Sequence, residues 1–337
     1  MNDRHLIVVP RVPIHRTGRL LLIIAALLAF HSRSGEQEKN IPPEKANALA
    51  TSYFYGINGY PKRLDKAAEL FEYAAKRNDP MAQCNLGKFY LAGVIFLQNY
   101  QKALELFRRA VEQENPEAAF CIGFMYANGL GVSRDYNQAK EWYQKAVDWG
   151  SKSALNNLAM LYLKGQGVTK SPEKALLLFR EAWDAGIVRA GVNIANIHLH
   201  GEGVPKSKEK AIKWFMKAAA LQDPYAMLEL GVIYFDDSDY EKAFVWLKKA
   251  AELGNVRAQS YLGLLYQEGL GVKKDLNQAL QWFRLAAEQN DSQALCALGF
   301  LYKDGIGVKR DLAKAREYFK KAAELGEDLA REELKKF

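Results

Sequence analysis

A single alanine position recurs at a fixed interval along most of the chain. Its members are spaced by 36 residues, apart from one step of 32 residues between Ala226 and Ala258. The series reads Ala46, Ala82, Ala118, Ala154, Ala190, Ala226, Ala258, Ala294 and Ala330. A fixed period of roughly 20–50 residues is typical of stacked repeats, each of which contacts only its neighbours. A repeat array is therefore predicted, and chain length is a poor guide to the number of domains.

Each period predicts a helix, a loop and a second helix. The most regular unit, Ala118 to Gly150, places small and apolar residues of its first helix at helical spacing. The loop Gly129-x-Gly131 follows, because glycine readily adopts the positive φ that a tight turn requires. The second helix is predicted to begin after Asp135 and to carry an apolar stripe of alanines around Trp142.

Polar residues and glycines mark the helix ends in almost every repeat. An N-cap side chain accepts a bond from an unpaired backbone amide and contributes about 1 kcal/mol relative to alanine. Second-helix N-caps are predicted at Asn99, Asp135, Ser171, Ser207, Asp239, Asp275 and Asp311, whereas Arg63 occupies this position in the first repeat. Left-handed residues are predicted after the second helices at Asn78, Gly150, Gly186, Gly254, Asn290 and Gly326.

These signals predict an all-α solenoid of about eight helix-loop-helix repeats. The array is expected to span residues 46–326, divided as 46–81, 82–117, 118–153, 154–189, 190–225, 226–257, 258–293 and 294–326. Residues 327–337 are predicted to form a C-terminal capping helix, because the end of a solenoid needs a polar cover. The sixth repeat lacks four loop residues between Tyr234 and Ala243, which predicts a tight acidic turn.

The repeat resembles the Sel-1-like repeat, a relative of the tetratricopeptide repeat. The resemblance rests on Ala-x-x-x-Leu-Gly-x-x-Tyr-x-x-Gly-x-Gly-Val followed by Asp-x-x-x-Ala-x-x-Trp/Tyr-x-x-x-Ala, over about residues 46–330. It implies a right-handed alpha-solenoid superhelix whose first helices line a concave surface, used as a scaffold or adaptor for proteins. Some cysteine-rich secreted relatives bind β-lactam compounds, but this chain lacks their paired cysteines in each repeat.

The net charge of +8 does not indicate a nucleic-acid partner. Half of this charge lies in residues 1–34, where five arginines accompany a single Asp3. Along the rest of the chain, basic and acidic residues alternate as they do on solvated helix faces. The concentrated basic stripe of a nucleic-acid-binding surface is missing from the sequence, so we expect no nucleic-acid partner.

The N-terminal segment predicts export. Leu20–Phe30 is an uninterrupted apolar run of eleven residues, preceded by Arg11, Arg16 and Arg19. As a helix this run would span about 16 Å, roughly half of the hydrocarbon core of a bilayer. Such a length is typical of a signal peptide rather than of a transmembrane helix.

Residues 1–34 are therefore predicted to be a signal peptide or an N-terminal anchor, followed by a linker over residues 35–45. Ser32 and Ser34 suit cleavage before Gly35. We expect export through the secretory route, to the periplasm, the exterior or the lumen of the secretory pathway. An uncleaved anchor, which would be the chain's contact with a membrane, and an organelle presequence are the alternative interpretations.

No catalytic residue and no cofactor are predicted. Ser171 and Lys174, like Ser207 and Lys210, match a Ser-x-x-Lys arrangement in which lysine activates a serine nucleophile. Both serines coincide with predicted N-caps, and this role already accounts for them. Short motifs of this kind often arise by chance, so the capping role is the preferred interpretation.

No metal site is predicted either. His198 and His200 are two residues apart and would point to different sides of a helix, with His198 at the core tyrosine position. The chain has three cysteines, Cys84, Cys121 and Cys296. Cys84 and Cys121 fall on first helices of neighbouring repeats, whose axes should lie about 8–10 Å apart, so free thiols rather than a disulfide are expected.

Two series of first-helix residues are candidates for partner binding. They lie three residues before and one residue after the first-helix glycine position, where tetratricopeptide geometry would direct them into a groove. The candidates are Phe120, Phe124, Asn156, Met160, Val192, Asn196, Leu228 and Val232. An exposed apolar patch of this size would indicate an interaction site. The alternative is that tight winding buries the series against the neighbouring first helix.

The loop of the second repeat is a further candidate contact. Ile95 replaces the second loop glycine, and Val94, Ile95, Phe96 and Leu97 form an apolar run. Ile95 and Phe96 are expected either to contact a partner or to pack under the divergent first repeat.

The sequence thus predicts an exported, non-enzymatic scaffold that binds a protein or peptide partner through its first helices. Two alternatives from other classes remain. One is a cell-wall-associated enzyme or β-lactam-binding protein that uses Ser171 or Ser207. The other is a membrane-anchored assembly subunit that keeps its N-terminal segment.

Overall fold

The computed structural model describes residues 41–337 of the chain. The predicted signal peptide or anchor and residues 35–40 of the predicted linker lie outside these described residues. Within residues 41–337 the regular structure consists of seventeen α-helices and contains no strand. The predicted all-α solenoid of helix pairs is confirmed.

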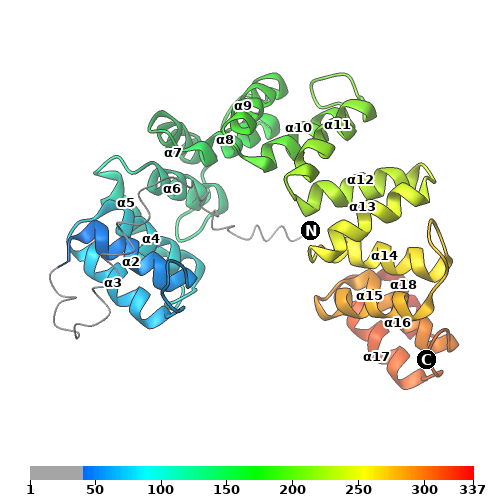
Figure 1. Cartoon of the computed structure of the whole chain (residues 1–337). Helices are drawn as coiled ribbons and strands as arrows, with labels where there is room; N and C mark the ends of the chain where they lie inside the picture. Colours follow the sequence, from blue (N-terminus) through cyan, green and yellow to red (C-terminus); the bar gives the residue numbers. More distant parts are fainter. Residues whose placement is uncertain (1–40) are drawn as a thin grey trace. The chain divides into compact units, whose positions relative to one another are not determined.

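The chain divides into two compact units, the first ending at Ser171 and the second running from Pro172 to Phe337. The first unit contains α2 (Pro43–Tyr55), α3 (Leu64–Lys76), α4 (Pro80–Ala92), α5 (Tyr100–Val111), α6 (Pro116–Asn128), α7 (Tyr136–Asp148) and α8 (Lys152–Lys164). The second contains α9 (Pro172–Asp184), α10 (Val188–His200), α11 (Lys208–Ala220), α12 (Pro224–Asp236), α13 (Tyr240–Glu252), α14 (Val256–Glu268), α15 (Leu276–Glu288), α16 (Ser292–Asp304), α17 (Leu312–Glu324) and α18 (Asp328–Leu334). Within each unit, successive helices pack in sequence order (Figure 1).

The helix ends follow the predicted signals. Asp135, for example, accepts backbone N–H bonds from Asn137 and Gln138 at 2.9 and 3.1 Å. The same role is filled by Asn99, Ser207, Asp239, Asp275 and Asp311. Arg63 makes no side-chain cap. All six residues predicted to be left-handed have positive φ, between 61° and 99°. Glu114 and Gln222, which no sequence signal indicated, adopt the same conformation.

One backbone hydrogen bond closes the loop of every repeat. The N–H of the second-helix N-cap residue donates to the carbonyl at the core tyrosine position, as in Asp135 to Tyr126 at 3.0 Å. The same bond occurs at Arg63, Asn99, Ser171, Ser207, Asp239, Asp275 and Asp311. It persists in the shortened sixth repeat, where Ser238 turns left-handed between Asp237 and the capping Asp239.

The second loop glycine also joins one repeat to the previous one. A Cβ on Gly131 would lie 2.4 Å from the Cβ of Tyr100, the first residue of α5. Gly167 and Gly271 approach the backbone of Tyr136 and Tyr240 equally closely. These glycines are therefore required for close approach between repeats as well as for their positive φ.

The aromatic residue that fills the core is not the one that the sequence pattern favoured. Trp142 is half-buried, whereas Tyr143 is buried and faces the first-helix glycine. A Cβ on Gly123 would lie 2.7 Å from Cδ1 of Tyr143. Phe71, Phe107, Phe179, Phe215, Phe283 and Phe319 occupy the same buried position in other repeats. The predicted alanines Ala139 and Ala146 are fully buried, so only the aromatic position of the predicted stripe is displaced by one residue.

The C-terminal helix α18 packs on α17 and buries Ala330. Glu333 of α18 pairs with Lys303 of α16 and with Lys336. Across residues 41–337, no helix is both long enough and apolar enough to span a bilayer.

Candidate functional site

The residues three before and one after the first-helix glycine position form what we call the first-helix face of each unit. In the first unit Phe120, Phe124, Asn156 and Met160 are all half-buried on this face. Phe120 packs against Tyr143, with ring centroids 5.8 Å apart. The aromatic candidates are therefore partly supported by the core and partly accessible.

The corresponding candidates of the second unit differ among themselves. Asn196 and Val232 are half-buried, but Val192 and Leu228 are each only 1% exposed. For Val192 and Leu228 the groove prediction is wrong, because both side chains belong to a core cluster that also includes Phe215. The four candidates of the first unit are therefore, taken together, more accessible than the four candidates of the second unit.

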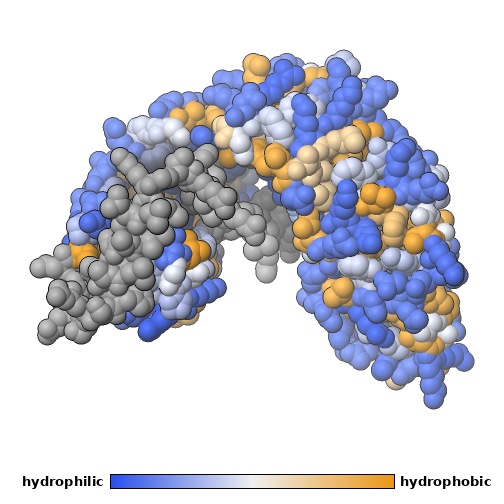
Figure 2. Space-filling model, viewed as in Figure 1, coloured by the Kyte–Doolittle hydropathy of each residue, from blue (hydrophilic) through white to orange (hydrophobic). Residues whose placement is uncertain are grey.

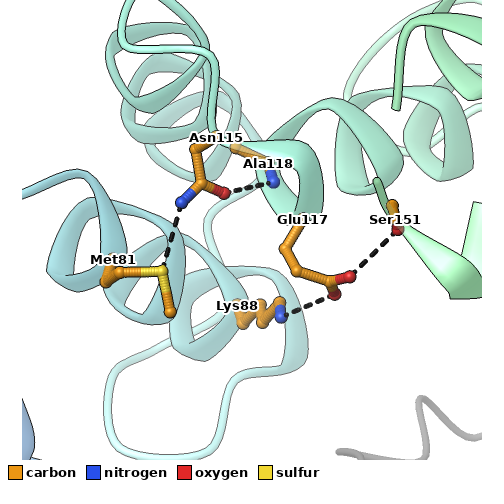
Figure 3. A network of polar contacts seen from close by, with 6 residues as sticks. All are labelled: Met81, Lys88, Asn115, Glu117, Ala118 and Ser151. Carbon is orange, nitrogen blue, oxygen red and sulfur yellow. Dashed lines mark hydrogen bonds and ion pairs between the residues drawn. The ribbon is translucent and has the colours of Figure 1, made fainter. Parts of the chain in front are cut away.

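A charged network that the sequence did not reveal lies beside them (Figure 3). Glu117, in the first turn of α6, points between α4 and the start of α8. One of its carboxylate oxygens lies 3.4 Å from the ammonium of Lys88, and the other accepts a hydrogen bond from Ser151 at 3.0 Å. The three successive first helices α4, α6 and α8 are thereby connected through a single carboxylate.

Glu117, Phe120 and Phe124 share one side of α6, because residues three or four apart align on a helix. The Lys88–Glu117 pair is therefore a polar border to the two phenylalanines. Burial opposes the charge of Lys88, but the thiols of Cys84 and Cys121 and the Glu117 carboxylate outweigh it and raise the pKa of Lys88. Lys88 is thus a fixed cation at neutral pH.

Asn115 and Asn156 add polar contacts near this face. Asn115 caps α6 through the backbone N–H of Ala118 at 2.9 Å and donates to the sulfur of Met81 at 3.3 Å (Figure 3). Asn156 donates to Asn157 at 3.3 Å. Asn115 thus stabilises the start of α6 and its contact with α4, whereas the Asn156 bond lies within α8.

Cys84 of α4 and Cys121 of α6 are both buried in the core of the first unit. The interaction between the two groups lowers the pKa of Cys84 and raises that of Cys121. Burial raises both pKa values, and the charge of Lys88 lowers them. The cysteines are free, as predicted.

The apolar loop of the second repeat is divided by the fold. Ile95 and Phe96 are half-buried and pack against the core of the first unit. Phe96 stacks on Tyr90, with ring centroids 4.6 Å apart and an interplanar angle of 19°. Val94 and Leu97 point outward, and Leu97 is 92% exposed. Of the two expectations for Ile95 and Phe96, packing rather than partner contact therefore agrees with the structure. The exposed part of the loop is Val94 and Leu97.

The Ser-x-x-Lys and histidine motifs adopt structural roles where they are described. Ser207 accepts the backbone N–H of Lys210 at 3.3 Å, which is the expected N-cap bond. His198 is buried and His200 is exposed. In residues 41–337 no group of three or more His, Cys, Asp or Glu side chains is arranged to hold a metal ion.

A shallow groove of about 380 Å³ lies on the second helices of the second unit. No site was predicted there from the sequence. Its apolar lining includes Met216, Trp246 and Leu253, and its edge carries Lys249 and Glu252. In the view of Figure 2 the second unit shows separate hydrophobic spots among hydrophilic residues. Outward Met and Leu residues on second helices are the sequence signal for this groove.

A family model described as Sel1 repeat matches the chain eight times. The matched residues are 46–79, 80–115, 116–150, 152–187, 189–223, 224–255, 256–291 and 292–327. The chain belongs to the Sel1 repeat family. Solenoids of this family are typical of scaffolds for protein–protein interaction, and they generally bind protein partners. No curated protein matches this Sel1 repeat protein.

Several solved structures are similar to this chain. A Sel1 repeat protein from Oxalobacter formigenes is 28% identical, with a TM-score of 0.62 over 96% of this chain and 97% of that one. Yeast Tom70 is 16% identical, with a TM-score of 0.56 over 94% and 72% of the two chains, and shows the fold alone. A protective antigen of uropathogenic Escherichia coli is 29% identical, with a TM-score of 0.46 over 87% and 79%.

The Lys88–Glu117 pair was detectable from the repeat register. Lys88 follows the first-helix glycine in the second repeat, a position held by uncharged residues in the next six repeats. Glu117 lies at the start of the next first helix, 29 residues later. Lys88 lies in α4 and Glu117 in the first turn of α6, the next first helix. Comparison of equivalent positions in successive repeats would therefore have indicated the pair.

Proposed function

We propose that this Sel1 repeat protein is a non-enzymatic scaffold that binds a protein or peptide partner on the first-helix face of its first unit. The observation that carries this proposal is the position of Phe120 and Phe124. Both are half-buried aromatic side chains on α6, next to the Lys88–Glu117 pair. Aromatic side chains at the centre of a contact, surrounded by polar groups, are typical of binding hot spots.

The repeat itself does not demand these phenylalanines. The position of Phe120 is held by Asn156 in the next repeat, and that of Phe124 by Met160. The core is instead filled by Tyr143 and by the buried residues of α6. A partner that presents apolar side chains to Phe120, Phe124 and Met160, and a polar group to Lys88 or Glu117, would match this surface.

Export is the second part of the proposal. It rests on the apolar run Leu20–Phe30 with its preceding arginines, in residues outside the described structure. Fractionation of the native source, followed by N-terminal sequencing of the protein, tests it. A mature N-terminus near Gly35 in an exported fraction is expected, whereas an intact N-terminus in a membrane fraction would indicate an anchored protein instead.

The binding proposal is tested with the double substitution Phe120→Ala and Phe124→Ala in the full chain. The matched control is Phe300→Ala, because Phe300 is half-buried at the position of Phe124 in the last repeat. Proteins retained by the wild type and by the control are identified, and the affinity of each purified candidate is then measured by calorimetry. We expect at least a tenfold loss for the double variant, about 1.4 kcal/mol or more. Equal affinities for a folded double variant would refute the proposed face.

A further inference from the structure

The groove on the second helices of the second unit has a buried floor and exposed apolar walls. It lies between α11 and α13, which are successive second helices (Figure 1). Ala219 and Met227 line it and are buried. Met216 and Leu253 line it as well, but they are 45% and 48% exposed. Two large apolar side chains thus contact water at one depression, and a partner that displaces this water would gain free energy.

Two other repeats fill the equivalent position with a pair of glutamines. In the seventh repeat, Gln259 donates to the carbonyl of Ala251 in the last turn of α13 at 3.3 Å. Gln289, which follows α15, donates to Gln259 at 3.0 Å. The second repeat has the same pair, in which Gln113 donates to the buried Gln83 at 3.5 Å. These bonds connect the ends of successive second helices through polar side chains.

The sixth repeat has apolar residues at both of these positions. Met227 directly follows the recurring alanine of its repeat, as Gln259 does. Leu253 lies fourteen residues after the N-cap of its second helix, as Gln289 does. The polar connection is lost here, because leucine has no hydrogen-bonding group in its side chain. The apolar groove is therefore a property of this repeat that the repeat pattern itself does not require.

Lysines dominate the charge around the groove. Lys217 of α11 and Lys248 and Lys249 of α13 are all exposed. Lys249 belongs to the lining, and its ammonium lies over the Trp246 ring at 4.6 Å from the centroid. Glu252 is the carboxylate of the lining, and it lies 3.9 Å from Lys248. The edge of the groove is thus positively charged and complementary to a partner that carries carboxylates beside its apolar side chains.

We propose that the groove between α11 and α13 binds an acidic amphipathic helix of a partner protein. A helix with apolar side chains at i, i+3 or i+4 and i+7 fits a groove between two other helices. Its apolar side chains contact Met216, Met227 and Leu253, and a carboxylate on its flank pairs with Lys249. Methionine suits this contact because its flexible thioether adapts to the incoming side chain. Each unit of the protein then has a binding surface of its own.

The test compares two fluorescent synthetic peptides by their anisotropy on binding to the full-length protein. Both peptides are designed as helices of about 18 residues with leucines along one face. One carries glutamates on both flanks of the leucine face, and its twin carries lysines there. We expect the acidic peptide to bind at least about tenfold more tightly than its twin, and to weaken as salt is added. Equal affinities, or no binding of the acidic peptide, would overturn the proposal.

Two variants change the groove in different ways. Met227→Gln with Leu253→Gln introduces the glutamine pair that the second and seventh repeats accommodate, so it should remain folded by circular dichroism. It should bind the acidic peptide at least about tenfold less tightly than the wild type. Lys249→Glu changes an exposed residue and should reverse the preference between the two peptides. Unchanged binding in either folded variant would contradict the proposed site.

The double variant Phe120→Ala with Phe124→Ala is the matched control. It removes the aromatic side chains of the first-helix face and should bind the acidic peptide with wild-type affinity. A loss of peptide binding in this folded variant would place the peptide on the first-helix face and overturn the groove proposal. Loss of the first unit's partner with peptide binding unchanged would show that the two surfaces act separately, as expected.

Cross-linking locates the bound peptide. A photoreactive acidic peptide should label residues 216–222 and 246–253, as mapped by mass spectrometry. Labels confined to other segments would overturn the proposal. Sedimentation velocity of the protein alone tests a second copy of this chain as the occupant. A wild-type dimer that the glutamine variant abolishes would assign the groove to self-association and would also overturn the proposal.

Discussion

The ammonium of Lys88 and the carboxylate of Glu117 lie 3.4 Å apart across the boundary between the second and third repeats. Their side chains are 20% and 30% exposed. Solvent screening is therefore weaker for this pair than for the ion pairs on the outer surface of the helices. Loss of one partner would leave the other charge partly buried and uncompensated.

We accordingly expect Glu117→Gln to lower the local stability of α4–α6 by about 1–3 kcal/mol. Glu72→Gln is the matched control, because Glu72 and Lys76 are 3.3 Å apart but the lysine that would be left unpaired is 74% exposed, against 20% for Lys88. Its cost should stay below about 0.5 kcal/mol. Hydrogen exchange of the amides in these helices measures both changes. Equal losses in the two variants would show that the burial of the Lys88–Glu117 pair is energetically unimportant.

The second loop glycine should be more sensitive to substitution than a glycine that only terminates a helix. Gly131 and Gly150 both have positive φ, at 69° and 97°. An added Cβ would meet Tyr100 at Gly131, but nothing within 4 Å at Gly150. Replacement by alanine should cost about 1–2 kcal/mol at either site through backbone strain. Gly131→Ala should cost about 1–3 kcal/mol more because of the clash.

Thermal and urea unfolding of the two alanine variants supply the comparison. The difference between them isolates the contact between repeats, since the backbone term is shared. A smaller loss for Gly131→Ala than for Gly150→Ala would mean that the loop relaxes away from Tyr100.

His198 should make the second unit sensitive to mild acid. Its Nδ1 atom is buried and lacks a hydrogen-bond partner among residues 41–337. Burial lowers the pKa of His198 below its usual 6.5, and the charges of Lys210 and Arg180 act in the same direction. The unfolded chain therefore binds the proton more readily than the folded one, so stability falls as the pH decreases through about 6.5.

Replacement of His198 by tyrosine, the residue of most other repeats, should remove this dependence. The expected result is a nearly constant unfolding midpoint for the second unit between about pH 7 and pH 5, where the wild type loses stability. Urea titrations across this range measure it. His200→Tyr is the control, because His200 is exposed two residues away. An unchanged pH profile in His198→Tyr would assign the acid sensitivity to another group.

Truncation of Phe96 should lower stability, whereas truncation of Leu97 should leave it nearly unchanged. Phe96 stacks on Tyr90, so Phe96→Ala should cost about 2–4 kcal/mol by loss of buried surface and ring contact. Leu97 is almost fully exposed, so Leu97→Ala should change stability by less than about 0.5 kcal/mol. Urea unfolding of both variants provides the measurement. A comparable loss for Leu97→Ala would reveal packing of this side chain that the structure does not show.

Local signals in the sequence were sufficient to predict the repeat and its helix ends. Asp135 caps its helix and Gly150 turns left-handed because both roles depend on neighbouring residues along the chain. The choice of the core aromatic was not predictable in the same way. Trp142 and Tyr143 are adjacent aromatics, and Tyr143 is the one whose ring packs against Gly123 of the first helix.

The candidate face was predicted only in part for a related reason. Phe120 and Val192 occupy equivalent repeat positions, yet one is half-buried and the other belongs to the core. Their exposure depends on how closely each first helix approaches its neighbour, which the pattern of one repeat does not specify. The Lys88–Glu117 contact likewise joins different first helices and requires the register between them.

The contact between each loop glycine and the preceding second helix gives the array a direction, because every repeat contacts the repeat before it in the same way. The loop of each regular repeat packs on the first turn of the preceding second helix. The second loop glycine makes this contact possible, because it has no side chain. A whole 36-residue cassette can therefore be duplicated or removed without creating a new kind of junction. Such a protein can change its reach by copying one unit, and its chain length becomes an adjustable property rather than a fixed one.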